Sequence, residues 1–535
     1  MKLKFLIFLI VILEFNNQSS TNTYDYSSYS AVSTNTDLTG ETLSSTTADQ
    51  SVVYITESGK TITNSNLNKD SGDSSKTENS EFFGVNAAVL VQGGGVTING
   101  GTITTKAKGA NALCATNNGK VTISGTKITS TAGSSGRGLH ATYGGEISAS
   151  NVEISSTGGS CATLATDRGE GTVTCNECTL STGGSGSPLI YSTGTITVTK
   201  TTGTATKAQA VVVEGKNSAS VTDSSNLNCY GLPNAENDID ISGVMLYQSM
   251  SGDAGTGTSI FNCQSSTISI DSASRVYGTA PMFFVTNTDA IINLESCTFT
   301  YGSSKFLSAG GTSRWGTSGS NGGVVTLNLK NQSIKGDFVI DGSSGLTINL
   351  ENSSIEGTIN TNKTGAKVAI TLDDKSTITL TGNSFYTSLT NSKTDGSNII
   401  KGSYTFEQYT EKEISRASSG TGGGEGGSGD KPSEPPDGKS SDGQGAKPSG
   451  EPPEPPDGKS SDGQGAKPSG DNSDQVSGKT NETQNSSNEN LGDDGDGAEI
   501  LNHFFIVTLS LIIVLLFWRW IIKLLNLILW NVIVV

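Results

Sequence analysis

The sequence predicts an all-β chain that winds as a right-handed parallel β-helix solenoid of about 11 coils. Short runs of alternating, often β-branched residues recur with a period of roughly 22 to 28 residues. Gly, Asn, Ser or Asp separates these runs, and such residues tolerate the backbone conformations that tight turns need. A unit this short cannot bury its apolar side alone, so stacked units must share one continuous core.

Each repeat contains three short strands. Segments 112–119, 138–145 and 162–169 align as the first strand and the turn that follows it. A second alternating run and a third apolar position follow in each repeat, at 96–98 and Ile103, at 121–123 and Ile128, and at 147–149 and Ile154. Coils about 4.8 Å apart give a rod of roughly 50 Å between residues 51 and 405. The right-handed sense follows from the preferred handedness of crossovers between parallel strands.

The two ends of the chain predict secretion and a membrane anchor. Lys2 and Lys4 precede the apolar run 5–13, so residues 1–20 are predicted to be a signal peptide. Residues 500–518 are predicted to form a transmembrane helix, with Arg519 and Lys523 on the cytoplasmic side and 519–535 as a short basic and apolar tail. A GPI-anchor signal is the alternative reading of this end.

The regions between the two ends differ in composition. Residues 21–50 are polar and are expected to be loosely ordered, and residues 51–415 carry the β-helix. Residues 416–499 are rich in Pro, Gly and Ser, and the 17-residue unit 434–450 recurs unchanged at 454–470. This composition predicts a disordered stalk.

Charge and composition limit the partners. The formal net charge is −17, and no basic stripe is present that would bind a nucleic acid backbone. The expected partners are a membrane, crossed once, and extracellular glycans or surface proteins. No cofactor is expected.

The seven cysteines favour a structural role. Cys175 and Cys178 form an isolated Cys-x-x-Cys, and the two histidines, His140 and His503, lie far apart, so a metal site is disfavoured. Cys175 and Cys263 align with Leu294, which predicts small buried apolar residues or an occasional disulfide between coils.

A local ligand-binding site is predicted at one edge of two adjacent coils. Its residues can hydrogen-bond sugar hydroxyls, although they can equally pair with each other across coils. They are Arg137, His140, Tyr143, Asp167, Arg168 and Glu170. No catalytic residues are assigned, because acidic residues do not recur in one column of the repeat as a glycan-cleaving site requires.

A surface along the first strands is the second candidate. The alignment places Leu113, Leu139, Leu189, Val211 and Met245 inward, with Thr163 as the exception. The same parity places two columns outward, one polar (Thr116, Thr142, Thr166, Ser192, Glu214, Gln248) and one mainly apolar (Leu90, Cys114, His140, Leu164, Ile190, Val212, Leu246). A slip of one residue would exchange the two faces.

Asn-x-Ser/Thr sequences mark candidate glycosylation sites. They lie at Asn17, Asn331, Asn352, Asn362, Asn481 and Asn485.

Four strings of the repeat region resemble a group of bacterial secreted β-helix proteins. They are 140–145 (HATYGG), 165–169 (ATDRG), 243–254 (GVMLYQSMSGDA) and 314–323 (RWGTSGSNGG). The group is described as adhesin-like and lies within the pectate-lyase-like superfamily, and the resemblance covers residues 82–390. It implies a parallel β-helix and a role in adhesion. Because the superfamily includes polysaccharide lyases and glycoside hydrolases, such an enzyme is the alternative expectation, and a structural coat protein without a ligand is a further one.

Overall fold

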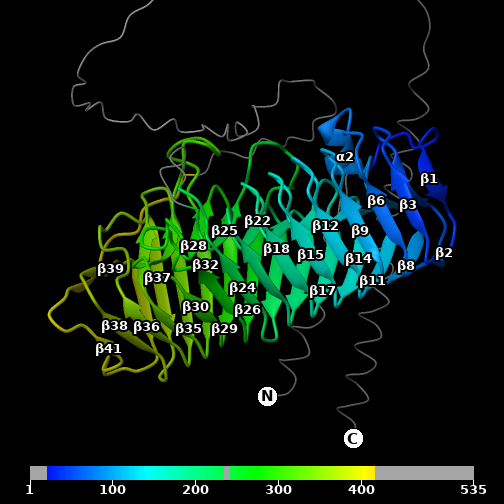
Figure 1. The fold of residues 1–535 in the computed structure, drawn as a ribbon. Helices are drawn as coiled ribbons and strands as arrows, with labels where there is room; N and C mark the ends of the chain where they lie inside the picture. Colours follow the sequence, from blue (N-terminus) through cyan, green and yellow to red (C-terminus); the bar gives the residue numbers. More distant parts are fainter. Residues whose placement is uncertain (1–20, 234–240, 416–535) are drawn as a thin grey trace, which may run out of the picture. The chain divides into compact units, whose positions relative to one another are not determined.

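The computed structural model describes residues 21–233 and 241–415, and this part of the chain is built almost entirely from parallel strands (Figure 1). Its one described helix is α2 (Thr77–Phe83). The predicted signal peptide, stalk, transmembrane helix and tail (1–20, 416–499, 500–518 and 519–535) lie outside the described residues. No helix within the described ranges is both long and apolar enough to cross a membrane.

Three long parallel sheets take their strands in turn from the chain, as a repeating coil requires. Sheet A has 12 strands: β1 (Ala31–Thr34), β4 (Ser51–Ile55), β7 (Val89–Gln92), β10 (Leu113–Thr116), β13 (Leu139–Ala141), β16 (Leu164–Thr166), β19 (Ile190–Ser192), β22 (Val211–Glu214), β25 (Val244–Tyr247), β28 (Phe283–Thr286), β31 (Lys305–Ala309) and β34 (Asp337–Ile340).

Sheet B is the longest, with 14 strands. They are β2 (Leu38–Thr39), β5 (Lys60–Thr63), β8 (Gly95–Asn99), β11 (Lys120–Ser124), β14 (Gly145–Ser150), β17 (Gly171–Asn176), β20 (Thr195–Thr199), β23 (Ser218–Thr222), β26 (Thr258–Gln264), β29 (Asp289–Glu295), β32 (Val324–Lys330), β35 (Gly345–Glu351), β37 (Lys367–Leu372) and β40 (Ser388–Asn391).

Sheet C completes each coil. Its 10 strands are β3 (Thr42–Ser45), β6 (Asn66–Lys69), β9 (Thr102–Thr105), β12 (Lys127–Ser130), β15 (Glu153–Ser156), β18 (Thr179–Thr182), β21 (Thr202–Ala205), β24 (Asn226–Cys229), β27 (Thr267–Ile270) and β30 (Thr298–Thr300). Two smaller sheets follow, one of β33 (Ser333–Lys335), β36 (Ser354–Gly357), β38 (Thr377–Leu380) and β41 (Ile399–Ile400), and one of β39 (Ser384–Tyr386) and β42 (Phe406–Gln408).

One apolar core runs inside the coils from Leu38 to Phe406. Burial alternates along the strands of sheet B, as in β11 and β29, because successive side chains point to opposite faces. The short turn from sheet B to sheet C repeatedly contains a residue with positive φ, such as Asn64 or Asn151. Asn tolerates this conformation better than most residues, so the predicted turn chemistry agrees with the backbone.

The solenoid begins earlier and is longer than the sequence predicts. Residues 21–50 are not loosely ordered throughout, because β1, β2 and β3 pair with β4, β5 and β6 and form a complete first coil. The prediction of about 11 coils from residue 51 is too low, since 13 of the 14 strands of sheet B follow that residue. The polar composition of residues 21–50 wrongly suggested a loosely ordered segment, because only one face of each strand needs to be apolar.

The predicted faces of sheet A are correct in the early coils and wrong by one residue in later ones. Leu139 pairs with Leu164, and Leu164 pairs with Ile190, so Leu164 takes the inward position predicted for Thr163, and Ile190 lies in the core together with Leu189. Val211 then pairs with Val244, and Leu246 also points inward, whereas Met245 points outward with Val212. Thr166 and Ser192 therefore follow inward parity, and the outward prediction stands for Leu90, Cys114 and His140.

The cysteines are structural, as predicted. Cys263 and Cys297 form a disulfide between adjacent coils, and Cys114, Cys161 and Cys229 are buried free thiols. Cys175 and Cys178 form a second disulfide within one turn, a pairing that the alignment does not indicate.

Candidate functional site

The outer face of sheet A is covered by segments from outside the repeat. Helix α2 precedes β7, and the loop 248–257 follows β25. We call these two segments the cover. Between them and the sheet lie five polar side chains that we call the covered cluster. They are Arg137, His140, Asp167, Tyr191 and Glu214.

Arg137 is the central charge of the covered cluster. Its Nη2 lies 3.5 Å from Glu81 Oε1 of α2 and 3.2 Å from Asp167 Oδ2, and all three side chains are less than 10% exposed. Burial raises the pKa of Asp167 to about 7, although the Arg137 charge opposes this shift. Arg137 therefore joins the cover to the turn that follows β16.

Arg168 joins both parts of the cover. Its guanidinium carbon lies 3.9 Å from the ring centroid of Phe82 in α2, and Nη2 donates to Asp253 Oδ1 of the loop 248–257. Tyr143 also packs under α2, since its ring stacks on Phe83 with the two centroids 5.7 Å apart. Residues far apart in sequence thus meet over β13 and β16.

Several atoms under the cover have no hydrogen-bond partner among the described residues. They include both ring nitrogens of His140, Arg137 Nη1 and Glu214 Oε1. Burial and the nearby Arg137 charge hold the pKa of His140 well below its usual value, so the ring is neutral. Leaving a buried polar atom unpaired costs about 1 to 3 kcal/mol, so this grouping requires an explanation.

Glu214 is the second carboxylate under the cover. The hydroxyls of Tyr191 and Tyr247 both donate to its Oε2, at 2.5 and 2.7 Å. Burial and the charge of Glu214 raise the pKa values of both tyrosines. Extending the strand pairing by one residue places Asp167, Thr193 and Glu214 in one outward column, so the two acids are separated by one coil.

The structure brings the predicted site residues together but places most of them out of solvent. Arg137, His140, Tyr143 and Asp167 are buried. Arg168 pairs with Asp253, and Glu170 pairs with Lys216 at 2.8 Å. Sequence analysis did not assign Glu81, Phe82 or Asp253 to the site, because these lie in insertions that the repeat does not describe. Glu214 points outward as predicted, but the one-residue slip put Thr166 and Ser192 in its column in place of Asp167 and Thr193.

The outer face of sheet B differs, because it carries an exposed polar ladder. Paired residues across all neighbouring strands from β5 to β40 form one column of hydroxyl and amide side chains: Thr61, Thr97, Thr122, Ser148, Thr174, Thr197, Ser220, Asn262, Asn293, Asn328, Asn349, Thr371 and Thr390. Each of these residues is at least partly exposed.

Four asparagines of this ladder line a groove of about 700 Å³. Each side-chain amide donates to the preceding side chain, from Asn349 through Asn328, Asn293 and Asn262 to Ser220, at 2.7 to 3.0 Å. An amide can donate two hydrogen bonds and accept two, so each one keeps capacity for a ligand. The fixed spacing comes from the strands, which lie about 4.8 Å apart.

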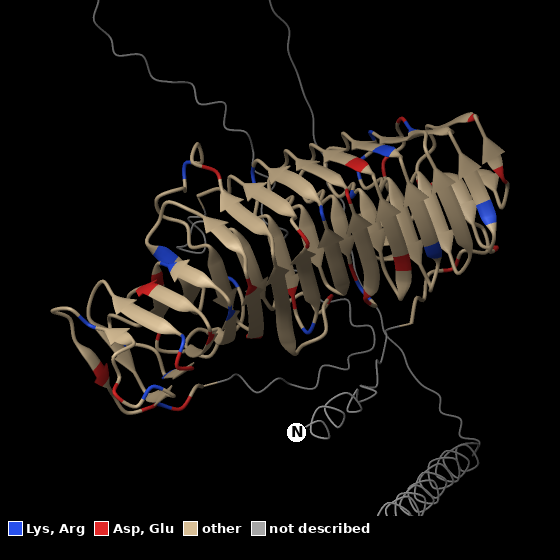
Figure 2. Ribbon diagram, turned by 90° about the horizontal axis from the view of Figure 1, so that it is seen from below, with Lys and Arg blue, Asp and Glu red and all other residues tan. Residues whose placement is uncertain are grey.

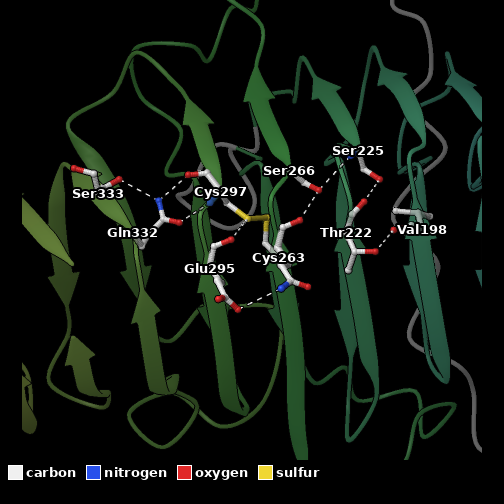
Figure 3. Close-up of a disulfide and its surroundings, with 10 residues drawn as sticks. Val198, Thr222, Ser225, Cys263, Ser266, Glu295, Cys297, Gln332 and Ser333 are labelled. Atoms are coloured by element: carbon white, nitrogen blue, oxygen red, sulfur yellow. Dashed lines mark hydrogen bonds between the residues drawn. A yellow bond between two sulfur atoms is a disulfide. The ribbon is translucent and has the colours of Figure 1, made fainter. Parts of the chain in front are cut away.

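A disulfide lies beside the groove, and most of the charged residues that line the groove are acidic. Figure 3 shows Glu295 beside the Cys263–Cys297 disulfide, with the side chain of Gln332 bonded to the backbone of Cys297. The charged residues in the groove lining are Glu295, Lys330, Glu351 and Asp373. Lys330 pairs with Glu295 at 2.9 Å, so the groove has an excess of negative charge. Elsewhere on the ribbon the charges are sparse and mixed in sign (Figure 2).

Three predicted glycosylation residues are exposed, Asn331, Asn352 and Asn362. Asn331 and Asn352 occupy equivalent turns in adjacent coils, where Asn352 Nδ2 donates to Asn331 Oδ1 at 2.7 Å. Asn17, Asn481 and Asn485 lie outside the described residues. Within the described ranges, no group of three or more His, Cys, Asp or Glu side chains is arranged to hold a metal ion.

No protein-family model, curated protein or solved structure matches this chain. The resemblance to adhesin-like β-helix proteins therefore stays a prediction from the quoted strings.

Proposed function

We propose that this protein is a membrane-anchored, cell-surface β-helix that binds extended glycans along the open face of sheet B. The observation that supports this proposal is the groove lined by Asn262, Asn293, Asn328 and Asn349. A column of amides at constant spacing presents repeated donors and acceptors, which suits a ligand that is itself a repeating chain of hydroxyl groups. The right-handed coil, the secretion signal, the stalk and the single membrane span remain parts of the proposal.

The charge of the groove favours a neutral or amino-bearing glycan. Glu351 and Asp373 have no opposite charge in the lining once Lys330 is paired with Glu295. Like charges repel, so a chain of uronate or sulfate groups is disfavoured there. This separates the proposed ligand from the acidic, pectin-like polymers that the resemblance suggests.

The experiment is a glycan array probed with the purified protein and two double variants. N293A/N328A removes two amides of the groove, and N66A/N226A removes two outward amides of sheet C as the matched control. Binding of neutral or amino-bearing glycans should be lost in N293A/N328A and kept in the control. Binding that is unchanged in N293A/N328A, or that is confined to uronates, would contradict the proposal.

Glycan cleavage is a second candidate, and the covered cluster is what favours it. Asp167 and Glu214 share a column with one coil between them, and the pKa of Asp167, near 7, suits a proton donor at neutral pH. Both carboxylates are buried, so a substrate reaches them only when the cover moves. Release of reducing sugar by the wild type, abolished in both D167N and E214Q, would support cleavage. Absence of product from both neutral and acidic polymers would rule out glycan cleavage.

A further inference from the structure

Arg168 is the residue through which the two parts of the cover contact each other over sheet A. One side of its guanidinium lies against Phe82 of α2, and the other donates to Asp253 of the loop 248–257. Asp253 lies 85 residues after Arg168 in sequence, and Phe82 lies 86 residues before it. The side chain of Arg168 is 38% exposed, so this contact lies at the surface of the cover.

Charged contacts help to hold the cover down where it crosses the covered cluster. Glu81 pairs with Arg137 and Arg168 pairs with Asp253, beside the packing of Phe82 on Arg168 and of Phe83 on Tyr143. Beneath it, His140, Arg137 and Glu214 retain buried atoms without a partner among the described residues. These atoms favour exposure to water, so they oppose closure and lower the free energy that opening requires.

We propose that α2 and the loop 248–257 form a cover that opens locally, while the coils stay folded, and that Arg168 is the link that keeps it closed. Opening exposes the covered cluster to solvent and leaves the sheets paired. The inference is independent of glycan binding at sheet B, because the cover lies over the outward side chains of sheet A.

A natural thiol reports the opening. Cys114 lies on the outer face of sheet A under the C-terminal end of α2, where a Cβ added to Gly84 would lie 2.5 Å from its Sγ. Cys229 is also free but lies inside the coils, and Cys161 is a third buried free thiol. Cys161 lies close to Arg137 and Glu81, so Cys229 is the internal control. The remaining four cysteines are in disulfides.

The experiment measures the rate at which a maleimide modifies each free thiol, with the modified peptides resolved by mass spectrometry. R168M removes the guanidinium that contacts Phe82 and Asp253. D253N removes the carboxylate charge that Arg168 binds and keeps the size of the side chain. R275M is the matched control, because Arg275 is exposed in the connection between β27 and β28. Loss of a partly buried charged hydrogen bond predicts labelling of Cys114 faster by about tenfold or more in R168M and D253N.

The expected result includes an unchanged rate for Cys229 in both variants, and a wild-type rate for Cys114 in R275M. Equal acceleration of Cys114 and Cys229 would show global unfolding and overturn the proposal. A wild-type rate for Cys114 in D253N and in any folded R168M would overturn it too.

Discussion

The outer faces of sheets A and B are built from the same repeat, but their side chains lie in opposite environments. On sheet A, helix α2 and the loop 248–257 bury charged groups such as Arg137 and Asp167. On sheet B, Asn293 and its neighbours remain at the surface and bond to each other. The repeat sets where side chains point, and insertions between coils decide which outward face meets water.

This difference predicts that charge removal has a large effect under the cover and a small one elsewhere. We expect R137M to lower the free energy of unfolding by about 3 to 5 kcal/mol, because Glu81 loses its buried cation and Asp167 loses the charge that favours its ionised form. Urea denaturation followed by circular dichroism measures the change.

The matched control is K127M, which removes an exposed partner of Glu153 at 2.7 Å. It should cost between about 0 and 1 kcal/mol. Equal losses in R137M and K127M would show that the cover does not isolate its charges from water.

The pH dependence of Asp167 is the next largest effect. Its folded pKa of about 7 lies above its unfolded value, so the folded state binds the proton more tightly. The stability that this provides is complete below the unfolded pKa and is lost as pH rises through about 7. Relative to D167N, the wild type should therefore lose up to about 4 kcal/mol between pH 4 and pH 8.

Denaturant titrations of both proteins across this range test the sign. The opposite contribution of neutral His140 is present in both proteins and cancels to first order in the difference. A difference that does not change with pH would place Asp167 in contact with solvent.

A smaller effect is expected for the disulfide beside the groove of sheet B. Cys263 and Cys297 are 34 residues apart in sequence, so their bond restricts the unfolded chain more than the bond between Cys175 and Cys178, which are 3 apart. We expect C263A/C297A to cost about 2 to 4 kcal/mol, and C175A/C178A to cost less. Thermal melts of the two double variants provide the comparison, and the reverse order would contradict it.

The smallest effect is expected on the open face itself. K120M removes the exposed pair of Lys120 with Glu146, whose side chains are 67% and 54% exposed. We expect a loss of less than about 1 kcal/mol, which high salt should abolish. A larger loss that persists in salt would mean that this face is covered.

The repeat could be predicted well from the sequence because each coil contains the same alternation of apolar and polar residues. Val121, Ile147 and Val173 pair in the structure as they align in the sequence. The alignment failed where coil length changed, at Thr163 and Met245, because one residue of slip exchanges core and surface. The grouping of Arg137 with Asp167 was predicted, but their burial was not, since Glu81 and Phe82 come from an insertion outside the repeat.

The segments over sheet A also affect how the solenoid responds to mechanical force. A stack in which each coil touches only its neighbours can unravel from an end, one coil at a time. Asn22 donates to Thr116 at 3.2 Å, and Arg168 donates to Asp253, so segments 94 and 85 residues apart are joined directly. These links span several coils, so a pull on the first coil must break them before it can peel the strands beneath. The coils that these links join should therefore unravel in larger steps than the coils that have no such link.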